Sequence, residues 1–311
     1  MPRKPRLVVE GEAAVYHVMS RTVLDGYVLG DAEKDHLLQL VQHYSSVYFV
    51  EVLGFCLMGN HFHLVVRMNP GEDYSDIEVK RRYSIYYQDD EKREEPLPGQ
   101  IAMFRHKWEK LSEFMKEIKQ SFSRYYNKRH NRKGFFWSDR FKSVLVENGE
   151  TLINCLAYVD LNPVRAGMVD RPDDYRWSSL GYHQQTNNKK QFLSLDFGLI
   201  GAEKLNKKQR LAKYRTFVYD VGSLHTDKGK SIDPKIVANE IKREFSPSCC
   251  DRFLSRTRYF TDSGIIGSRE FVRQFWVRLK SDDDNPDKQP VRVAGLTGMF
   301  SLKRLSEIDG I

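Results

Sequence analysis

The sequence contains no run of apolar residues long enough to cross a membrane, and its basic start lacks the apolar segment of a signal peptide. Its four cysteines show no CxxC spacing, so the pattern indicates neither a disulfide framework nor a zinc site built from thiolates. No internal repeat is evident. These absences predict a cytoplasmic protein whose cysteines are reduced and structural.

Basic residues outnumber acidic ones, which gives the 311-residue chain a net charge of +8. This balance favours a polyanionic partner without identifying it. Cations and aromatic rings alternate within residues 123–137, and single-stranded nucleic acid needs both, for its phosphates and its bases. A solvated helix end would explain the charges alone. The cations of this segment are Arg124, Lys128, Arg129, Arg132 and Lys133.

The first part of the chain predicts an α+β domain. Residues 15–22 are expected to form a strand, a helix is expected to begin at Asp31 as its N-cap, and strands are expected over 49–57 and 63–68. The turn between the last two strands is placed at residues 59–60. Strand, helix, strand, strand is the opening of a ferredoxin-like split βαβ arrangement, an antiparallel sheet with helices on its faces.

Further elements are expected within the same domain. Residues 69–105 break the pattern and are predicted to be a mobile insertion with some helix. A helix over 108–126 carries an apolar stripe at helical spacing, which indicates core packing. A strand over 142–147 and a helix from 150 to about 161 follow.

Composition divides the chain into three parts. Residues 1–185 are predicted to be the catalytic domain and residues 186–228 a linker or helical connector. Residues 229–311 are predicted to be a helical C-terminal domain, with helices over 233–245 and 267–280. This last part is either a DNA-binding unit or a cover packed on the first domain.

Two histidines with one apolar residue between them stand at the head of a predicted buried strand. Because side chains alternate along a strand, His61 and His63 face one side and Phe62 faces the other. Two imidazoles in this arrangement suit a divalent metal ion, although an HxH at a strand end is more often structural. A third ligand and a nucleophile elsewhere in the chain are needed to make this pair a site.

A later helix offers candidates for both roles. Tyr158 and Asn162 are four residues apart and are therefore neighbours on one helical face. Pro163 restrains the backbone at Asn162 and predicts the end of the helix there. Beside the two histidines, the amide oxygen of Asn162 is a candidate third ligand, and Tyr158 would face a phosphate held on the metal. Alone, this tyrosine would be interpreted as a core residue.

Three blocks in this order and spacing resemble the REP-associated tyrosine transposases. The blocks are residues 59–65, 138–143 and 158–167. That group belongs to the single-tyrosine HUH transposase-like proteins, in which U is a bulky apolar residue. The resemblance covers residues 10–185, and residues 259–272 are similar to the tail of the long subgroup of the family.

The resemblance implies an activity and assigns roles to residues. It makes His61 and His63 the metal-binding pair for Mg²⁺ or Mn²⁺, Tyr158 the nucleophile and Asn162 the third ligand. A tyrosine hydroxyl ordinarily has a pKa of about 10, so a cation on the scissile phosphate is needed to assist its attack near neutrality. The implied activity is cleavage and transfer of single-stranded DNA at hairpins of repetitive extragenic palindromes, through a 5′-phosphotyrosine.

Some assignments stay open at this point. Tyr125 and Tyr126 are rival nucleophiles, although their place beside the basic cluster favours DNA contact or packing. Arg140, Lys142 and Arg165 are candidate DNA contacts, and structural ion pairs are the equal alternative for them.

Other functions are compatible with the same residues. A non-catalytic DNA- or RNA-binding or regulatory protein can use the same scaffold. Val65 stands where a nucleotide hydrolase of the HxHxH type needs a third histidine, and nothing resembles the helicase attached to replication initiators. His17 either faces the site or is buried, and it is not counted among the ligands. The protein is expected to act as a monomer or a homodimer.

Overall fold

The structure is a computed structural model that divides into two compact units, Met1–Ile241 and Lys242–Ile311. Among the residues it describes, no helix has the length and apolar character needed to span a membrane. The described residues are 8–87, 94–196, 204–224, 229–245, 266–270, 272–273, 277, 289–292 and 300–301.

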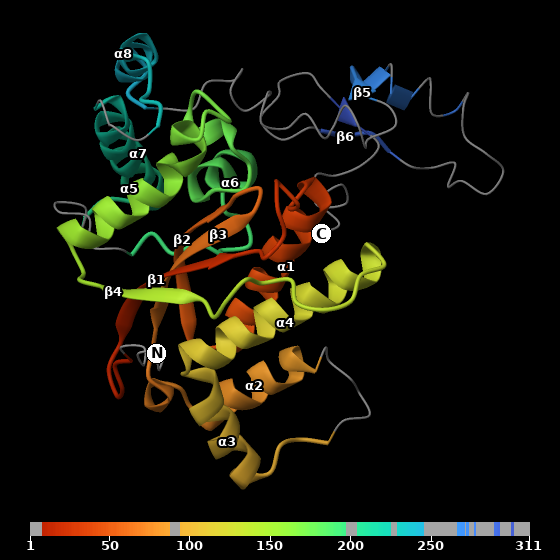
Figure 1. Cartoon of the computed structure of the whole chain (residues 1–311). Helices are drawn as coiled ribbons and strands as arrows, with labels where there is room; N and C mark the ends of the chain where they lie inside the picture. Colours follow the sequence, from red (N-terminus) through yellow and green to blue (C-terminus); the bar gives the residue numbers. More distant parts are fainter. Residues whose placement is uncertain are drawn as a thin grey trace. The chain divides into compact units, whose positions relative to one another are not determined.

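A four-stranded antiparallel sheet forms the centre of the first unit (Figure 1). Its strands are β1 (Ala14–Arg21), β2 (Val50–Leu57), β3 (His61–Met68) and β4 (Lys142–Val146). The spatial order is β2-β3-β1-β4, so β3 lies between the parallel strands β1 and β2 that the first helix connects. This is the split βαβ order, and the predicted ferredoxin-like α+β fold is confirmed.

Helices cover both faces of the sheet (Figure 1). On one face lie α1 (Asp31–Val47) and α4 (Leu111–Arg129), which pack against each other. The other face is covered by α5 (Glu150–Arg165) and α6 (Ser179–Thr186), both of which contact β2. The apolar stripe predicted on α4 is core, because its members are buried: Leu111, Phe114, Met115, Ile118 and Phe122.

Alternation along β3 sends its side chains to these two faces. The ring of Phe62 packs against Trp137, with ring centroids 5.3 Å apart, and Trp137 is in turn bonded to the backbone of α4. His61 and His63 therefore point to the opposite face, toward α5. The sheet thus places both histidines under the helix that carries the candidate nucleophile.

The predicted insertion contains regular helices. They are η1 (Gly71–Asp73), α2 (Asp76–Tyr86) and α3 (Pro98–Trp108). α2 contacts α1, and α3 contacts α4. The guanidinium of Arg82 donates to the carbonyl of Tyr48 and lies 5.0 Å from the ring centroid of Tyr74, which attaches α2 to the rest of the first unit.

The predicted N-cap of α1 is wrong by one position. Gly30 is the N-cap, and its carbonyl accepts from the backbone nitrogen of Lys34. Asp31 is the first helical residue, where its carboxylate lies near the positive end of the helix dipole instead of accepting a capping bond.

The predicted end of α5 is also wrong, because the helix continues through Pro163 to Arg165. A proline has no N–H, so the carbonyl of Val159 loses its usual donor four residues later. The side-chain nitrogen of Asn162 donates to this carbonyl at 3.4 Å and to the carbonyl of Tyr158 at 2.8 Å. The amide therefore compensates within the helix for the missing donor, and the helix does not end at the proline.

Two helices after residue 186 belong largely to the first unit. They are α7 (Lys207–Ser223) and α8 (Pro234–Lys242). The buried carboxylate of Glu240 on α8 accepts from Arg171 and Arg215, so α8 is tied to the first unit by ion pairs. The first unit consequently extends past the boundary expected at residue 229.

In the second unit, the described residues form a small antiparallel sheet in the order β5-β7-β6. Its strands are β5 (Ile266–Gly267), β6 (Val291–Arg292) and β7 (Phe300–Ser301). Half of the helix predicted over 267–280 and more than half of the family-like tail at 259–272 lie outside the described residues. A DNA-binding C-terminal domain stays a prediction.

Candidate functional site

The two histidines of β3 lie side by side on the face covered by α5. The ring centroids of His61 and His63 are 5.1 Å apart and their planes are nearly perpendicular, at 82°. His61 is half-buried, whereas only 3% of the His63 surface is exposed. The pair is thus held at the edge of a buried layer, with His61 nearer to solvent.

A hydrogen bond orients each imidazole through its Nδ1 atom. The Nδ1 of His61 lies 2.7 Å from the amide oxygen of Asn60, which can only accept, so this nitrogen donates and the lone pair is on Nε2. The Nδ1 of His63 lies 2.9 Å from the Nε2 of His17. In both rings the Nε2 atom is left to face a ligand, which is the usual arrangement of a metal-binding histidine.

Burial keeps these imidazoles uncharged. It lowers the pKa of His63 to about 3, and the neighbouring His17 and His61 contribute in the same direction. Burial also lowers the pKa of His17 and that of His61. Near neutral pH the three rings are neutral, and a neutral imidazole is the form that binds a metal ion.

Tyr158 projects from α5 over the same histidines. Its ring meets those of His63 and His17 edge-on, with centroid distances of 5.8 and 6.0 Å. Its neighbours on the helix, Ala157 and Val159, are fully buried, whereas Tyr158 is 41% exposed. The helix therefore fixes the tyrosine at the border between the core and solvent.

Arg165 and Asn162 lie on the same helix as Tyr158. Arg165 contacts the tyrosine ring, whereas Asn162 bonds to its own helix. The guanidinium of Arg165 lies 5.6 Å from the ring centroid of Tyr158, as expected for residues two turns apart. The side-chain nitrogen of Asn162 donates to two backbone carbonyls of its own helix. The side-chain oxygen is therefore the atom that could bind a ligand. Within the described part of the chain, no group of three or more His, Cys, Asp or Glu side chains is placed to hold a metal ion. Asn162 stays a predicted third ligand.

The rival tyrosines lie on α4, on the other side of the sheet. Tyr125 stacks on His36 with centroids 3.7 Å apart, and Tyr126 stacks on His130 at 4.1 Å. Tyr126 is buried. Because the sheet separates α4 from the face that bears His61 and His63, the geometry favours packing roles for both tyrosines.

The predicted DNA-binding cations fall into two groups. One follows α4 and the loop after it, and consists of Arg124, Lys128, Arg129, Arg132 and Lys133. Of these, Arg129 pairs with the carboxylate of Glu33 at 3.2 Å, and Arg132 lies over the ring of Tyr126 at 5.9 Å. The other group, Arg140 and Lys142, is exposed at the start of β4. Lys142 is opposite Met19, which is itself opposite His63, so this cation lies at the same end of the sheet as the histidines.

The sequence left two alternatives for His17, facing the site or burial, and the structure shows it buried against His63. The alternation in β1 places His17 on one face of its strand, but the sequence does not say which strand lies beside it. The antiparallel pairing sets His17 opposite Val65 and Met19 opposite His63, so His17 is the diagonal neighbour of His63 on the same face. The position of His17 on one face of the predicted strand over 15–22 was the signal that the sequence offered.

Residues 12–108 match a family described as "Transposase IS200 like". This span contains β1, β2 and β3 with all three histidines of the site. The predicted family resemblance is confirmed. A protein of Haemophilus influenzae, provisionally named as a REP-associated tyrosine transposase, is 24% identical over 159 residues, which are 49% of this chain and 75% of that protein. A solved structure of a REP-associated tyrosine transposase bound to a REP hairpin has 15% identity and a TM-score of 0.40, covering 58% of this chain and 84% of that one.

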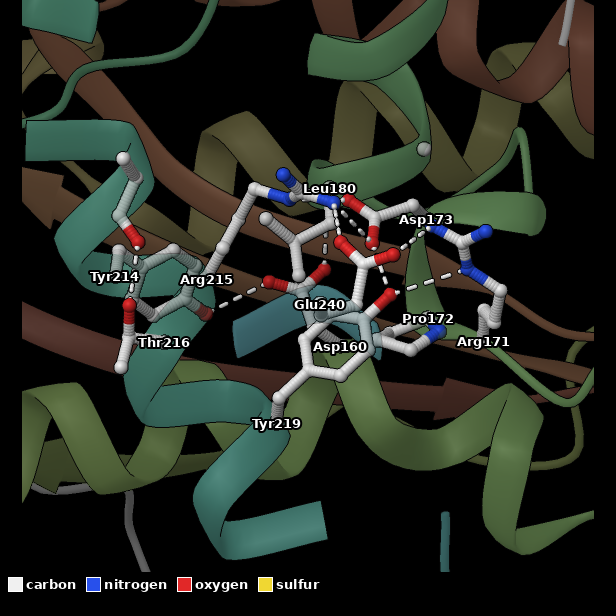
Figure 2. A network of polar contacts seen from close by, with 12 residues as sticks. Asp160, Arg171, Pro172, Asp173, Leu180, Tyr214, Arg215, Thr216, Tyr219 and Glu240 are labelled. Atoms are coloured by element: carbon white, nitrogen blue, oxygen red, sulfur yellow. Dashed lines mark hydrogen bonds and ion pairs between the residues drawn. The ribbon is translucent and has the colours of Figure 1, made fainter. Parts of the chain in front are cut away.

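A buried polar network holds the outer side of α5 (Figure 2). The carboxylate of Asp160 accepts from the hydroxyl of Tyr214 at 2.7 Å and from the backbone nitrogen of Leu180 at 3.1 Å. Burial raises the pKa of Asp160 to about 7, although these hydrogen bonds act in the opposite direction. This carboxylate links α5 to α6 and α7.

The second part of the network ties α7 and α8 to η2 (Pro172–Asp174). Arg215 donates to Asp173 at 2.9 Å and to Glu240 at 3.3 Å, and Tyr219 donates to Asp173 at 2.6 Å (Figure 2). All four side chains are buried. The helix that carries Tyr158 is therefore supported from behind by partnered polar groups, none of which was singled out from the sequence.

Proposed function

We propose that this protein is a metal-dependent endonuclease and strand transferase for single-stranded DNA, which acts at hairpins of the repetitive extragenic palindrome type through a covalent tyrosine ester. The observation that carries the proposal is the placement of the Tyr158 ring against His63 and His17, on the face of β3 that also bears His61. A helix presents the phenol and a strand presents two neutral imidazoles, and solvent reaches Tyr158 and His61 while His63 is buried.

The donor set fits a divalent cation such as Mg²⁺ or Mn²⁺. His61 and His63 would hold it through their Nε2 atoms, because hydrogen bonds engage both Nδ1 atoms. The amide oxygen of Asn162 would be the third protein ligand. When bound, the cation supplies charge withdrawal from the scissile phosphate. Asn60 and His17 would keep the two rings oriented toward it.

The chemistry of the chain itself is carried by Tyr158. Its Oη atom would attack the phosphorus in line with the bond to the 3′ oxygen of the preceding nucleotide. The new bond joins Oη to the 5′ phosphate, the bond to the 3′ oxygen breaks, the phenolic proton leaves to solvent and the 3′ oxygen takes up a proton. Because a phosphate ester replaces a phosphate ester, another 3′ hydroxyl can reverse the reaction without ATP.

Cations near the site would steady the negatively charged strand. Arg165 lies over the ring of Tyr158, and Lys142 lies two strands from His63, and both would contact phosphates next to the reacting one. The cations of α4 lie on the other face of the sheet and would contact parts of the DNA that are more distant from the reacting phosphate.

A non-catalytic hairpin-binding protein is the second candidate. It is favoured by the lack, among the described residues, of a third ligand from the usual metal-binding types. In that case the histidines would be structural and the basic surface alone would carry the function.

A covalent-adduct assay distinguishes the endonuclease from the non-catalytic hairpin-binding protein. The full chain is incubated with Mn²⁺ and hairpin oligonucleotides that carry single-stranded flanks, and the products are separated under denaturing conditions. We expect a protein–DNA adduct that Tyr158→Phe abolishes. Tyr125→Phe is the matched control, since it removes a hydroxyl from another partly exposed helical tyrosine, and it should leave the adduct intact. An adduct that persists in Tyr158→Phe refutes the nucleophile, and binding without an adduct on any hairpin supports the second candidate.

A further inference from the structure

Residues 134–141 lead into β4 and run back along α4 (Figure 1). A groove lies between this segment and the helix. It encloses about 940 Å³, which is within the range of small-molecule sites, roughly 300–1,000 Å³. The floor is aromatic, since Phe136, Trp137 and Phe141 are buried beneath it. The indole of Trp137 donates to the carbonyl of Lys119 at 3.0 Å and so fixes the floor to α4. We call this site the α4 groove.

The rim of the α4 groove combines positive charge with an exposed ring. Four cations and one carboxylate line it: Lys116, Lys119, Arg124, Arg140 and Asp139. Phe135 also lines it and is 87% exposed, the most exposed phenylalanine among the described residues. The exposed ring of Phe135 and the apolar floor beside it together form a surface that a flat ligand can cover.

The α4 groove is joined to the candidate active site through the backbone. Ser138, in the wall of the groove, donates to the carbonyl of Arg21 from its backbone nitrogen at 3.0 Å and from its hydroxyl at 3.0 Å. Arg21 is opposite His61 in the sheet. The groove lies on the α4 face of the sheet, opposite to the face that bears the histidines, and β1 alone separates Ser138 in its wall from His61 at the same end of the sheet.

We propose that the α4 groove binds one unpaired nucleobase of the DNA strand, from the single-stranded flank of the hairpin. The base stacks on Phe135 and covers the aromatic floor, and the rim cations contact the phosphates on either side of it. This assignment rests on the proposed function for the identity of the polymer, and it adds a base-binding site that is separate from the metal ligands and the nucleophile.

Two physical arguments favour an unpaired base over other occupants. A base within a duplex keeps both its faces stacked, so only an unpaired one can offer a face to Phe135. An acidic peptide would satisfy the cations but would leave the aromatic floor and the exposed ring without a flat partner. The interleaving of rings and cations is the combination that proteins use for single strands.

The test uses hairpin oligonucleotides with a single-stranded flank in which 2-aminopurine, a base whose fluorescence is quenched by stacking, replaces one base at a time. When the full chain is added, we expect the fluorescence to fall at one flank position. At stem positions the fluorescence should stay at the level of the free DNA. Phe135→Ala should abolish that quench and weaken binding of the flanked hairpin by roughly tenfold or more. Phe135→Tyr, which keeps a ring, should restore both.

Two controls isolate the groove. Ile77→Ala removes another exposed apolar side chain, 80% exposed on α2, and should change neither the quench nor the affinity. A hairpin without a flank should bind wild type and Phe135→Ala equally. An equal loss on both substrates, or a quench that survives Phe135→Ala, overturns the proposal. Polyglutamate that competes with the flank for a Phe135-dependent site would identify an acidic peptide as the occupant and would also overturn it.

The outcomes separate this inference from the proposed function. The quench is measured without any cleavage, so it can be present in a protein that forms no tyrosine adduct. Conversely, Tyr158→Phe should keep the quench while it loses the adduct, because the phenol does not contact the stacked base.

Discussion

The Nε2 atom of His17 on β1 lies 2.9 Å from the Nδ1 atom of His63 on β3, and the two rings are stacked with centroids 5.1 Å apart. This contact makes His17 a positioning residue for the proposed metal ligand. It fixes the plane of the His63 ring and occupies its Nδ1 atom, so that Nε2 is the atom that would bind the metal. Tyr158 touches both rings, so the same contact also forms the surface on which the phenol rests.

Removing this contact should weaken metal binding. We expect His17→Ala to lower the affinity for Mn²⁺ about 10- to 100-fold, because the partners that orient a ligating imidazole typically contribute that much. Electron paramagnetic resonance of free Mn²⁺ during titration measures the affinity without any reaction. His36→Ala, on the other face of the sheet, is the control and should leave the affinity unchanged. Equal affinity in His17→Ala and wild type would show that the contact is structural only.

The buried carboxylate on α5 should make stability depend on pH. The pKa of Asp160 is raised to about 7 from an ordinary 3.8, so between these pH values the folded state retains a proton that the unfolded state has released. The contribution of this group is therefore fully present below about pH 4 and is lost as pH rises through about 7. Within that range the free energy of unfolding should fall by at most about 1.4 kcal/mol for each pH unit.

The variant Asp160→Asn removes this titration and keeps the shape of the side chain. Urea unfolding at several pH values should show the variant gaining stability relative to wild type as pH rises from 4 to 8. Asp220→Asn, which changes an exposed carboxylate on α7, should show a flat difference. Taking the difference from wild type cancels the titration of other buried groups such as His183, whose pKa is lowered to about 4. A flat difference for Asp160→Asn would contradict the assignment.

The amide of Asn162 should couple to the proline that follows it. We expect Asn162→Ala to cost about 1 kcal/mol in the free energy of unfolding, the usual contribution of such a hydrogen bond. In a Pro163→Ala background the cost should be smaller, since the new N–H supplies the donor that the Val159 carbonyl lacks. Urea unfolding of the four proteins in this cycle gives the coupling.

The metal affinity of the same variants tests the second role of Asn162. If its oxygen is the third ligand, Asn162→Ala should bind Mn²⁺ more weakly in both backgrounds, because Pro163→Ala restores the helix and not the ligand. Full affinity in the background with alanine at 163 would remove Asn162 from the ligand set.

The sequence predicts those parts of the fold that depend on patterns among neighbouring residues. Alternation in β1, β2 and β3 and the apolar stripe of α4 predict elements that the structure contains, with small errors at their ends. The errors have physical causes that the pattern does not carry: Gly30 can serve as an N-cap without a side chain, and the amide of Asn162 allows α5 to pass through Pro163.

The sequence by itself determined that His61 and His63 share a face, because strand alternation depends only on neighbouring residues, and that Tyr158 and Asn162 share a helix side. Only the tertiary structure decided which partners complete the site. His17 reaches His63 through strand pairing, and Asp160 finds Tyr214 through helix packing, over separations of 46 and 54 residues. Such contacts depend on register and on the angle between elements, which no local pattern in the chain encodes.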